Sequence, residues 1–177
     1  MHRNKMKLLF LWFMMFKKSI FAFLLFIPQA NALNLQEHYC MAEAIYYEAR
    51  NQPVIGQLAI GVVIRNRVRL PKWPSTVCGV VHEGYYYQGI PLMDRCQFSY
   101  WCDGRLEDPE HDKAWGMAES VAFLIMTENI TIEGMESATH YHAKSVKPRW
   151  IVKFNRCGII KDHIFYCPKT SRISISY

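Results

Sequence analysis

The sequence lacks several patterns that would assign it to a common class of protein. Its 177 residues contain no Cys-x-x-Cys pair and no His-Glu-x-x-His motif, which are typical of thiolate zinc sites and of zinc peptidases. After the N-terminal segment there is no internal repeat, no low-complexity run and no interdomain linker. These absences favour a single domain of ordinary size.

An uninterrupted apolar run long enough to cross a membrane is also missing. Lys17 and Lys18 divide the apolar N-terminal segment, and neither half reaches the roughly 18 residues that a membrane-spanning helix needs. The apolar run 19–27 is followed by an A-x-A segment at 30–32. This order predicts a secretory signal peptide over residues 1–32, cleaved after Ala32, and it argues against a membrane anchor.

The chain has little net charge once this leader is set aside. Five of the 21 Lys and Arg residues lie in positions 1–32, and none of the 15 Asp and Glu residues does. Residues 33–177 therefore hold 16 basic and 15 acidic side chains, a net charge of +1, against +6 for the whole chain. Charge gives no support for nucleic-acid binding. We expect residues 33–177 to form one exported domain, periplasmic or extracellular, that is monomeric and has no stable membrane anchor.

All six cysteines lie after the leader. An even number of cysteines in an exported chain predicts three disulfides. Closure of short loops favours Cys96–Cys102 and Cys157–Cys167, which leaves Cys40–Cys78, although six cysteines allow 15 connectivities. A thiolate zinc site is the rival interpretation, but the spacing does not favour it.

Apolar periodicity predicts three helices. The first begins after the capping residue Asn34, the second covers about residues 54–70, and the third begins with Asp108 as its N-cap. Residues 138–143 and 159–166 read as short strands. The expected fold class is therefore α+β and helix-dominated, in a single domain with short β segments.

A carboxylate stands near the end of the first predicted helix. Glu48 follows an apolar helical stretch and precedes the helix-stopping Pro53. A partly dry environment disfavours the charged form of a carboxyl group, which keeps it protonated near neutral pH and able to act as a general acid. Glu48 is therefore the candidate catalytic residue. The alternative is an ordinary exposed glutamate at a helix end.

Short motifs are spread over about residues 39–166. They are YEAR (47–50), GQLAI (56–60), RNRV (65–68), CQFS (96–99), DG (103–104), ATHYHA (138–143), PRW (148–150) and HIFY (163–166). In this order they resemble the cell-wall hydrolase family typified by the spore cortex-lytic enzyme SleB. The resemblance implies a lysozyme-like fold and cleavage of peptidoglycan glycan strands without a cofactor. It also implies that Glu48 matches the family's catalytic glutamate.

The chain departs from the family pattern just after this glutamate. The family reads Gly-Glu where this sequence has Asn51 and Gln52, so a second carboxylate is missing there. A conventional glycosidase needs a second carboxylate at a defined separation. Glu43 lies about 140° away around the helix, which leaves Asp94 and Asp103 as candidates in the Cys-rich loop. A lytic transglycosylase needs no second carboxylate, because the 6-hydroxyl of the muramic acid attacks the anomeric carbon.

The expected substrate-binding residues combine flat aromatic rings with polar groups. Tyrosine rings have an apolar face and a polar edge, which suits stacking on sugar rings. Gln97 and Ser99 alternate along an extended segment, so they share a face and can bind N-acetyl groups or hydroxyls; local hydrogen bonding within the loop is the alternative. The residues expected to bind substrate are Tyr47, Gln97, Ser99, Tyr100, His140 and Tyr141.

Three histidines suggest an alternative enzymatic function. His140 and His142 share a face of the predicted strand 138–143, and with His163 they suggest a zinc-dependent amidase or peptidase acting on the stem peptide. No carboxylate is paired with them in the sequence, so we favour structural hydrogen bonding and expect no metal. A disulfide-stapled, non-catalytic wall-binding module is the third interpretation. It leaves the motif around Glu48 unexplained.

Overall fold

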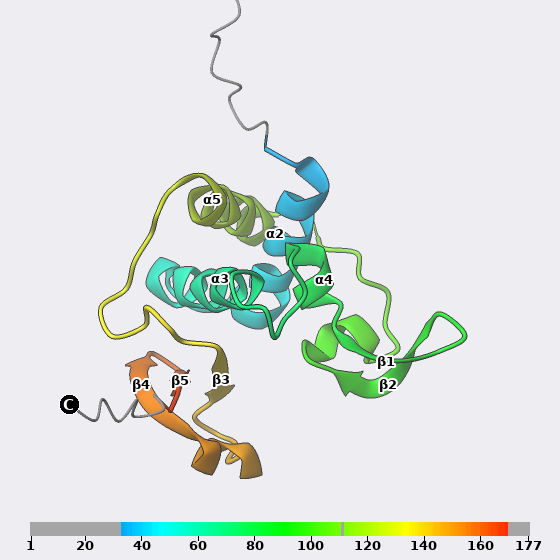
Figure 1. Cartoon of the computed structure of the whole chain (residues 1–177). Coiled ribbons are helices and arrows are strands. Elements are labelled where there is room, and N and C mark those ends of the chain that lie inside the picture. Colours follow the sequence, from blue (N-terminus) through cyan, green and yellow to red (C-terminus); the bar gives the residue numbers. More distant parts are fainter. Residues whose placement is uncertain (1–32, 111, 170–177) are drawn as a thin grey trace, which may run out of the picture. The chain divides into compact units, whose positions relative to one another are not determined.

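The structure is a computed structural model, shown in Figure 1, in which residues 33–110 and 112–169 are described. The described residues belong to one unit of the chain, which begins at Leu33. The predicted signal peptide lies outside the described residues. Within the described ranges, no helix combines the length and the apolar character that a membrane crossing requires.

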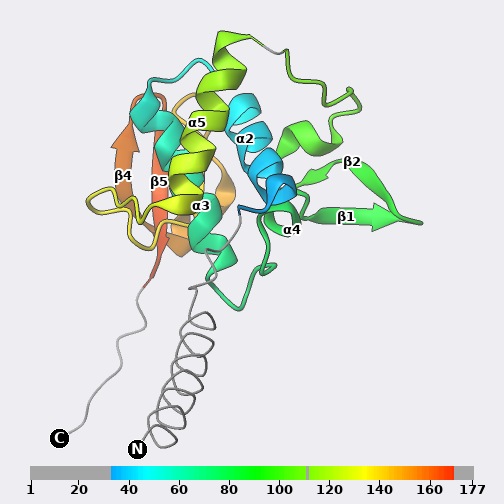
Figure 2. The same cartoon turned by 90° about the horizontal axis from the view of Figure 1, so that it is seen from above.

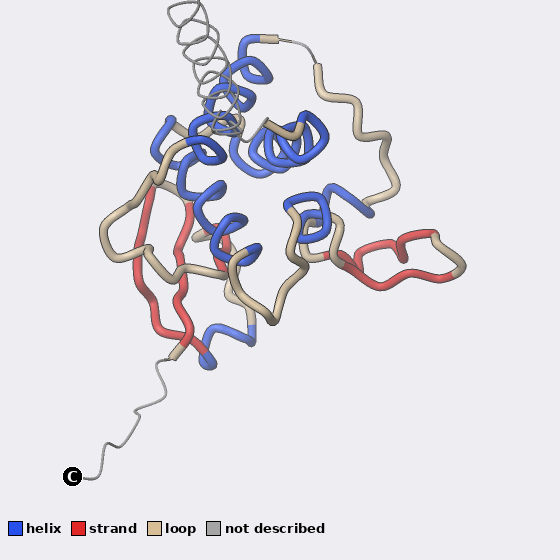
Figure 3. Tube along the Cα trace, turned by 45° about the horizontal axis from the view of Figure 1, so that its top comes forward, coloured by secondary structure: helices blue, strands red, loops and turns tan. Residues whose placement is uncertain are grey.

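Helices dominate the described chain, with short strands in two separate places (Figure 3). The helices are α2 (Leu35–Ala49), α3 (Val54–Val68), α4 (Val77–Val81) and α5 (Lys113–Thr127), with 3-10 turns η1 (Ser99–Cys102) and η2 (Arg149–Lys153). The strands are β1 (Gly84–Tyr87), β2 (Ile90–Cys96), β3 (His140–Ala143), β4 (Phe154–Ile160) and β5 (His163–Pro168). The predicted α+β, helix-dominated fold class is confirmed.

Helix α2 lies in the apolar core and carries the candidate catalytic residue near its C-terminal end. The Asn34 side chain accepts hydrogen bonds from the backbone N–H groups of Gln36 (3.0 Å) and Glu37 (3.3 Å), as the sequence predicts for an N-cap. Beyond this cap the helix is buried almost all round, and Ala42, Ala44 and Ile45 have no exposed surface. Helix α2 is therefore held rigidly by its neighbours.

Helices α3 and α5 pack closely beside α2 (Figure 2). A Cβ atom added at Gly61 of α3 would lie 2.7 Å from Cγ1 of Ile125 of α5, so glycine is what allows the two helices this approach. Helix α3 ends at Val68, two residues before the predicted boundary. The core thus sits among α2, α3 and α5.

Helix α5 begins later than predicted. Asp112, not Asp108, is its N-cap, and the Asp112 carboxylate accepts hydrogen bonds from the N–H groups of Ala114 and Trp115, both at 2.9 Å. Both aspartates can cap a helix. Asp112 lies three residues before Trp115, the first buried side chain of the apolar stripe, so the helix starts there and residues 103–110 form a connecting segment.

The predicted strand 159–166 is wrong as a single element. It contains the end of β4, a turn at Lys161 and Asp162, and most of β5, and the two strands pair antiparallel with Ile160 opposite His163. Lys161 has a φ of 48°, which reverses the chain. The apolar residues on both sides of the turn make the pattern look continuous. The predicted strand 138–143 is shorter in the structure, because β3 begins at His140.

The strands form two antiparallel sheets. Strands β1 and β2 form a hairpin, and the second sheet has the order β3-β5-β4, which leaves β3 at an edge. The side chain of Asn66 on α3 donates hydrogen bonds to the carbonyls of Met135 (3.2 Å) and Ala138 (2.9 Å). These bonds fix the segment that leads into β3 against α3, and so place β3 beside the end of α2.

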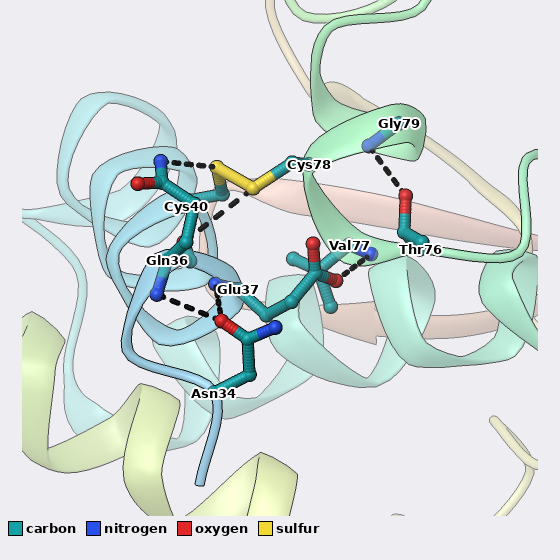
Figure 4. The surroundings of a disulfide bond; sticks show 8 residues. All are labelled: Asn34, Gln36, Glu37, Cys40, Thr76, Val77, Cys78 and Gly79. Carbon is teal, nitrogen blue, oxygen red and sulfur yellow. Dashed lines mark hydrogen bonds between the residues drawn. A yellow bond between two sulfur atoms is a disulfide. The ribbon is translucent and has the colours of Figure 1, made fainter.

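The six cysteines form the three pairs that loop closure favours. The disulfides are Cys40–Cys78, Cys96–Cys102 and Cys157–Cys167, and no free cysteine remains. Figure 4 shows Cys40–Cys78, which joins α2 to α4. The Glu37 carboxylate accepts a hydrogen bond from the Val77 N–H at the same junction. Three disulfides fit an oxidising, extracytoplasmic compartment.

Candidate active site

A cavity of about 270 Å³ opens beside the end of α2. Its walls come from α2, α3, the segment after β2, strand β3 and the chain that follows β3. The lining residues are Glu48, Arg67, Gln97, Phe98, Ser99, His140, Tyr141, His142, Ala143, Val146, Trp150 and His163. Residues far apart in the sequence therefore meet around one carboxylate.

The Glu48 carboxyl group is partly buried and has two polar neighbours, Tyr141 and Arg67. Burial raises the pKa of Glu48 above its usual value, while a hydrogen bond from Tyr141 and the charge of Arg67 act in the opposite direction. The Tyr141 hydroxyl donates to Glu48 Oε2 at 3.0 Å. Because burial is the largest influence, Glu48 holds its proton to a higher pH than an exposed glutamate does.

Arg67 is a residue of this site that the sequence analysis did not single out. It is 4% exposed, and its Nε donates to the Thr139 carbonyl at 2.8 Å. Its guanidinium lies 4.4 Å from the ring centroid of Trp73 and 5.4 Å from that of Phe98. The sequence carried one signal for it, since an arginine inside an apolar helix must find buried partners.

Gln97 and Ser99 both line the cavity, but Phe98 between them does so too, and Ser99 begins the 3-10 turn η1, so the segment does not show the predicted alternation. The Gln97 backbone N–H donates to the Glu83 carbonyl at 2.8 Å, which fixes the segment. In the described part of the chain, neither the Gln97 amide nor the Ser99 hydroxyl forms a hydrogen bond with the protein. Local loop bonding therefore does not occupy these groups.

Tyr47 and Tyr100 do not line the cavity. Their rings stack on each other, with centroids 4.7 Å apart and an angle of 17° between the planes. Tyr100 is buried in the core, and Tyr47 packs edge-on against Tyr46 at 5.2 Å. Tyr141 lies in the cavity but directs its hydroxyl at Glu48. Of the three predicted tyrosines, Tyr141 is the one that lines the cavity and hydrogen-bonds Glu48.

His140 forms part of an aromatic cluster at the cavity wall. Its ring centroid lies 4.0 Å from Phe154 and 5.3 Å from Trp150, and its Nδ1 lies 2.9 Å from the Thr139 hydroxyl. Burial lowers the pKa of His140 to about 4, with the charges of Arg67 and Lys72 acting in the same direction. His140 is therefore neutral near pH 7.

The other two histidines also reach the cavity. His142 Nε2 lies 3.0 Å from the Tyr166 hydroxyl and its Nδ1 lies 2.8 Å from the Ala143 carbonyl, so both ring nitrogens have protein partners. His163 Nδ1 is buried without a hydrogen-bond partner. Over residues 33–110 and 112–169, no three His, Cys, Asp or Glu side chains come together as a metal-binding group. The geometry therefore gives the zinc alternative no support.

The candidate second carboxylates lie away from the cavity wall. The Asp103 carboxylate accepts a hydrogen bond from the Arg105 N–H at 2.9 Å, and Asp94 lies within β2 in a left-handed conformation, with a φ of 58°. Glu43 is buried among the helices. Among the described residues that line the cavity, Glu48 is the only Asp or Glu.

Gln52 takes a defined place where the family pattern has glutamate. It is 7% exposed, and its Nε2 donates to Asp162 Oδ2 at 3.0 Å and to Asn51 Oδ1 at 3.2 Å. A glutamate here would place its carboxylate beside that of Asp162, and the two negative charges would repel each other. The amide instead ties the end of α2 to the turn between β4 and β5.

Glu43 is the second buried carboxyl group of α2 and the basis of a stability prediction. Burial and then the charge of Glu107 raise the pKa of Glu43 to about 7. The unfolded chain loses this proton at an ordinary glutamate pKa, and the native protein only near 7. The free energy of unfolding must therefore fall as the pH rises through this interval.

Replacing Glu43 by glutamine is expected to remove this fall in the free energy of unfolding. The variant should be more stable than the parent at pH 8 by roughly 1–3 kcal/mol, with little difference at pH 4. Urea unfolding at both pH values measures the effect. Glu119→Gln, an exposed glutamate of α5, is the control and should leave the pH dependence unchanged. If the free energy of unfolding falls equally with pH in the parent and in Glu43→Gln, the raised pKa of Glu43 is contradicted.

Comparison with known proteins shows the family of this chain. Residues 51–166 match the family model described as Cell Wall Hydrolase. The chain is 40% identical over 62 residues to the spore cortex-lytic enzyme of Bacillus cereus, covering 32% of this chain and 24% of that protein. It is 49% identical over 50 residues to that of Bacillus subtilis (strain 168), covering 28% and 16%. The matched segments thus span less than a quarter of these curated relatives.

Two solved structures share the fold over most of their length. The catalytic domain of the germination-specific lytic transglycosylase SleB from Bacillus anthracis has a TM-score of 0.57 and 26% identity, covering 77% of this chain and 98% of that one. The catalytic domain of the Bacillus cereus SleB protein has a TM-score of 0.54 and 25% identity, covering 77% and 93%. Glu48 lies just before the segment that matches the family model.

Proposed function

Since this chain belongs to the Cell Wall Hydrolase family, we propose that it cleaves peptidoglycan glycan strands as a lytic transglycosylase. The bond cut is the β-1,4 bond between N-acetylmuramic acid and N-acetylglucosamine, and Glu48 is the catalytic residue. The observation that carries the proposal is the single carboxylate in the cavity wall, partly buried and hydrogen-bonded by Tyr141. One carboxylate suffices for transglycosylation, whereas conventional glycoside hydrolysis uses two.

The reaction follows from the environment of Glu48. The protonated carboxyl group gives its proton to the glycosidic oxygen as the bond to the anomeric carbon breaks. The resulting carboxylate then accepts the proton of the muramic acid 6-hydroxyl, whose oxygen bonds to the same carbon and closes a 1,6-anhydro ring. Burial keeps Glu48 protonated at the start, and the Tyr141 hydroxyl and the Arg67 charge stabilise the carboxylate formed midway.

Other groups of the cavity wall are suited to holding the sugar. The Gln97 amide and the Ser99 hydroxyl are available for N-acetyl groups and hydroxyls. The Trp150 ring offers a flat apolar surface, and His140 offers a neutral imidazole. Tyr141 serves instead to orient Glu48. In this proposal the disulfide-bonded domain acts on the wall after export, with the signal peptide cleaved after Ala32.

Mass spectrometry of the fragments released from purified peptidoglycan tests the proposal. We expect fragments that end in 1,6-anhydromuramic acid, each lighter by one water than the hydrolytic product, and no loss of activity in EDTA. Fragments that end in reducing muramic acid would support cleavage of the glycosidic bond by hydrolysis and would refute transglycosylation. Free stem peptides released in a chelator-sensitive reaction would refute both, and would point to the histidines.

A further inference from the structure

The β1–β2 hairpin carries an unusual number of exposed apolar side chains. Figures 1 and 2 show it projecting outward beside α4. Its large exposed residues are Tyr85 (70%), Tyr86 (44%), Tyr87 (66%), Ile90 (68%), Leu92 (43%) and Met93 (66%). Exposed apolar side chains gathered on one element mark a place where another molecule binds.

The hairpin is held firmly at its base. The Trp101 indole N–H donates to the Tyr86 hydroxyl at 2.8 Å, and that hydroxyl donates to the His82 carbonyl. The disulfide Cys96–Cys102 joins the end of β2 to η1. At the tip, Gln88 and Gly89 have φ values of 49° and 82°, as a tight two-residue turn requires. The exposed rings are therefore presented on a fixed support.

Tyr85 and Tyr87 are the most exposed of the three consecutive tyrosines of β1. Tyr86 between them is less exposed and uses its hydroxyl at the base of the hairpin, and the pairing of β1 with β2 is irregular between Gly84 and Tyr86. Tyr87 is opposite Ile90, which is also exposed. Unlike Tyr86, neither Tyr85 nor Tyr87 uses its hydroxyl within the described chain. Both rings present an open apolar face with a free polar edge.

The hairpin leads directly into the wall of the cavity. Strand β2 ends at Cys96 and leads directly into Gln97 and Ser99, which line the cavity around Glu48. Cys96 pairs with Gly84 and Ile90 pairs with Tyr87, so the hairpin extends about 10 Å from its base, the length of the four residues of β1. A polymer that leaves the cavity past Gln97 and Ser99 would meet the hairpin.

We propose that the exposed rings of Tyr85 and Tyr87 on the hairpin bind the glycan strand outside the cavity, as an additional saccharide-binding surface. The inference rests on the proposed function, because it takes the same strand as ligand. Sugar rings have flat C–H faces that pack on tyrosine rings, and their hydroxyls match the free edges of the rings. Residues 84–96 hold one acid and one base, Asp94 and Arg95, so the hairpin lacks the basic excess that anionic lipid attracts.

Binding to purified peptidoglycan tests the inference directly. The Glu48→Gln protein, which should bind without cutting, is sedimented with peptidoglycan, with and without Tyr85→Ser and Tyr87→Ser. We expect the double change to weaken binding roughly tenfold, since two aromatic contacts are lost. Phe123→Ser, which removes an exposed aromatic ring from α5, is the control and should bind like the parent. In active protein, KM for long strands should rise with kcat unchanged, while cleavage of a tetrasaccharide stays the same.

The outcomes separate the hairpin from the active site. Parent-like binding and KM in the double variant would overturn the inference and leave the proposed function intact. Binding of the parent to phosphatidylglycerol vesicles, lost in the double variant while peptidoglycan binding is kept, would reassign the two rings to a membrane surface. A parent that neither binds nor cuts peptidoglycan would overturn the proposed function, and this inference with it.

Discussion

Replacing Glu48 by glutamine is expected to lower the rate of strand cleavage by roughly 10²–10⁴-fold, because the amide cannot deliver a proton to the leaving oxygen. The amide oxygen can still accept the hydrogen bond from Tyr141, and the side-chain shape is kept. Burial penalises the charged form of Glu48, so the neutral amide should not reduce stability near neutral pH. Rates are measured as fragments released from purified peptidoglycan, and folding by thermal unfolding.

Glu43→Gln is the matched control for this prediction. It makes the same chemical change at another buried glutamate of the same helix, five residues away and outside the cavity wall. It should keep near-parental activity. A folded Glu48→Gln protein that still digests peptidoglycan at the parental rate would overturn the assignment of Glu48. Equal loss in both variants would point to damage to α2 and would also contradict it.

Local patterns in the sequence were enough to predict the parts of the site that lie within single segments. The N-cap Asn34 marks the start of α2, and the apolar stretch before Pro53 places Glu48 near its end. Gln97 and Ser99 line the cavity as expected for substrate-binding residues, although Phe98 between them lines it too. The predicted start of a helix was wrong where two residues could each serve as its N-cap. Asp108 and Asp112 both qualify as caps, and only the packing of α5 decides between them.

Partners that are distant in the sequence could not be predicted in the same way. Tyr47 is the neighbour of Glu48 in sequence, yet its ring stacks on Tyr100, and Tyr141 from an edge strand bonds the carboxylate. Arg67 lies on α3, and its contact with Thr139 depends on how β3 docks. Such pairings come from tertiary packing, which periodicity does not encode.

Arg67→Met is expected to affect both stability and the pH dependence of cleavage. The change leaves the Thr139 carbonyl without its donor and removes the cation from the Trp73 and Phe98 rings, at a cost of about 2–4 kcal/mol in the free energy of unfolding. Urea unfolding measures this loss. The apolar stem of methionine fills much of the same space, which limits the damage to packing.

The direction in which Arg67→Met changes the pH dependence of cleavage follows from the charge that is removed. The Arg67 charge lowers the pKa of Glu48, so removing it raises that pKa further. In the proposed mechanism cleavage needs protonated Glu48, so activity is expected to fall as the pH rises through its pKa. The alkaline limb of the pH profile should therefore move to higher pH in Arg67→Met. Arg67→Lys keeps the charge but not the planar guanidinium, so it should lose stability while holding the limb near its parental position. An unmoved limb in Arg67→Met would show that Arg67 serves only to anchor β3, and that its charge does not act on the catalytic carboxyl group.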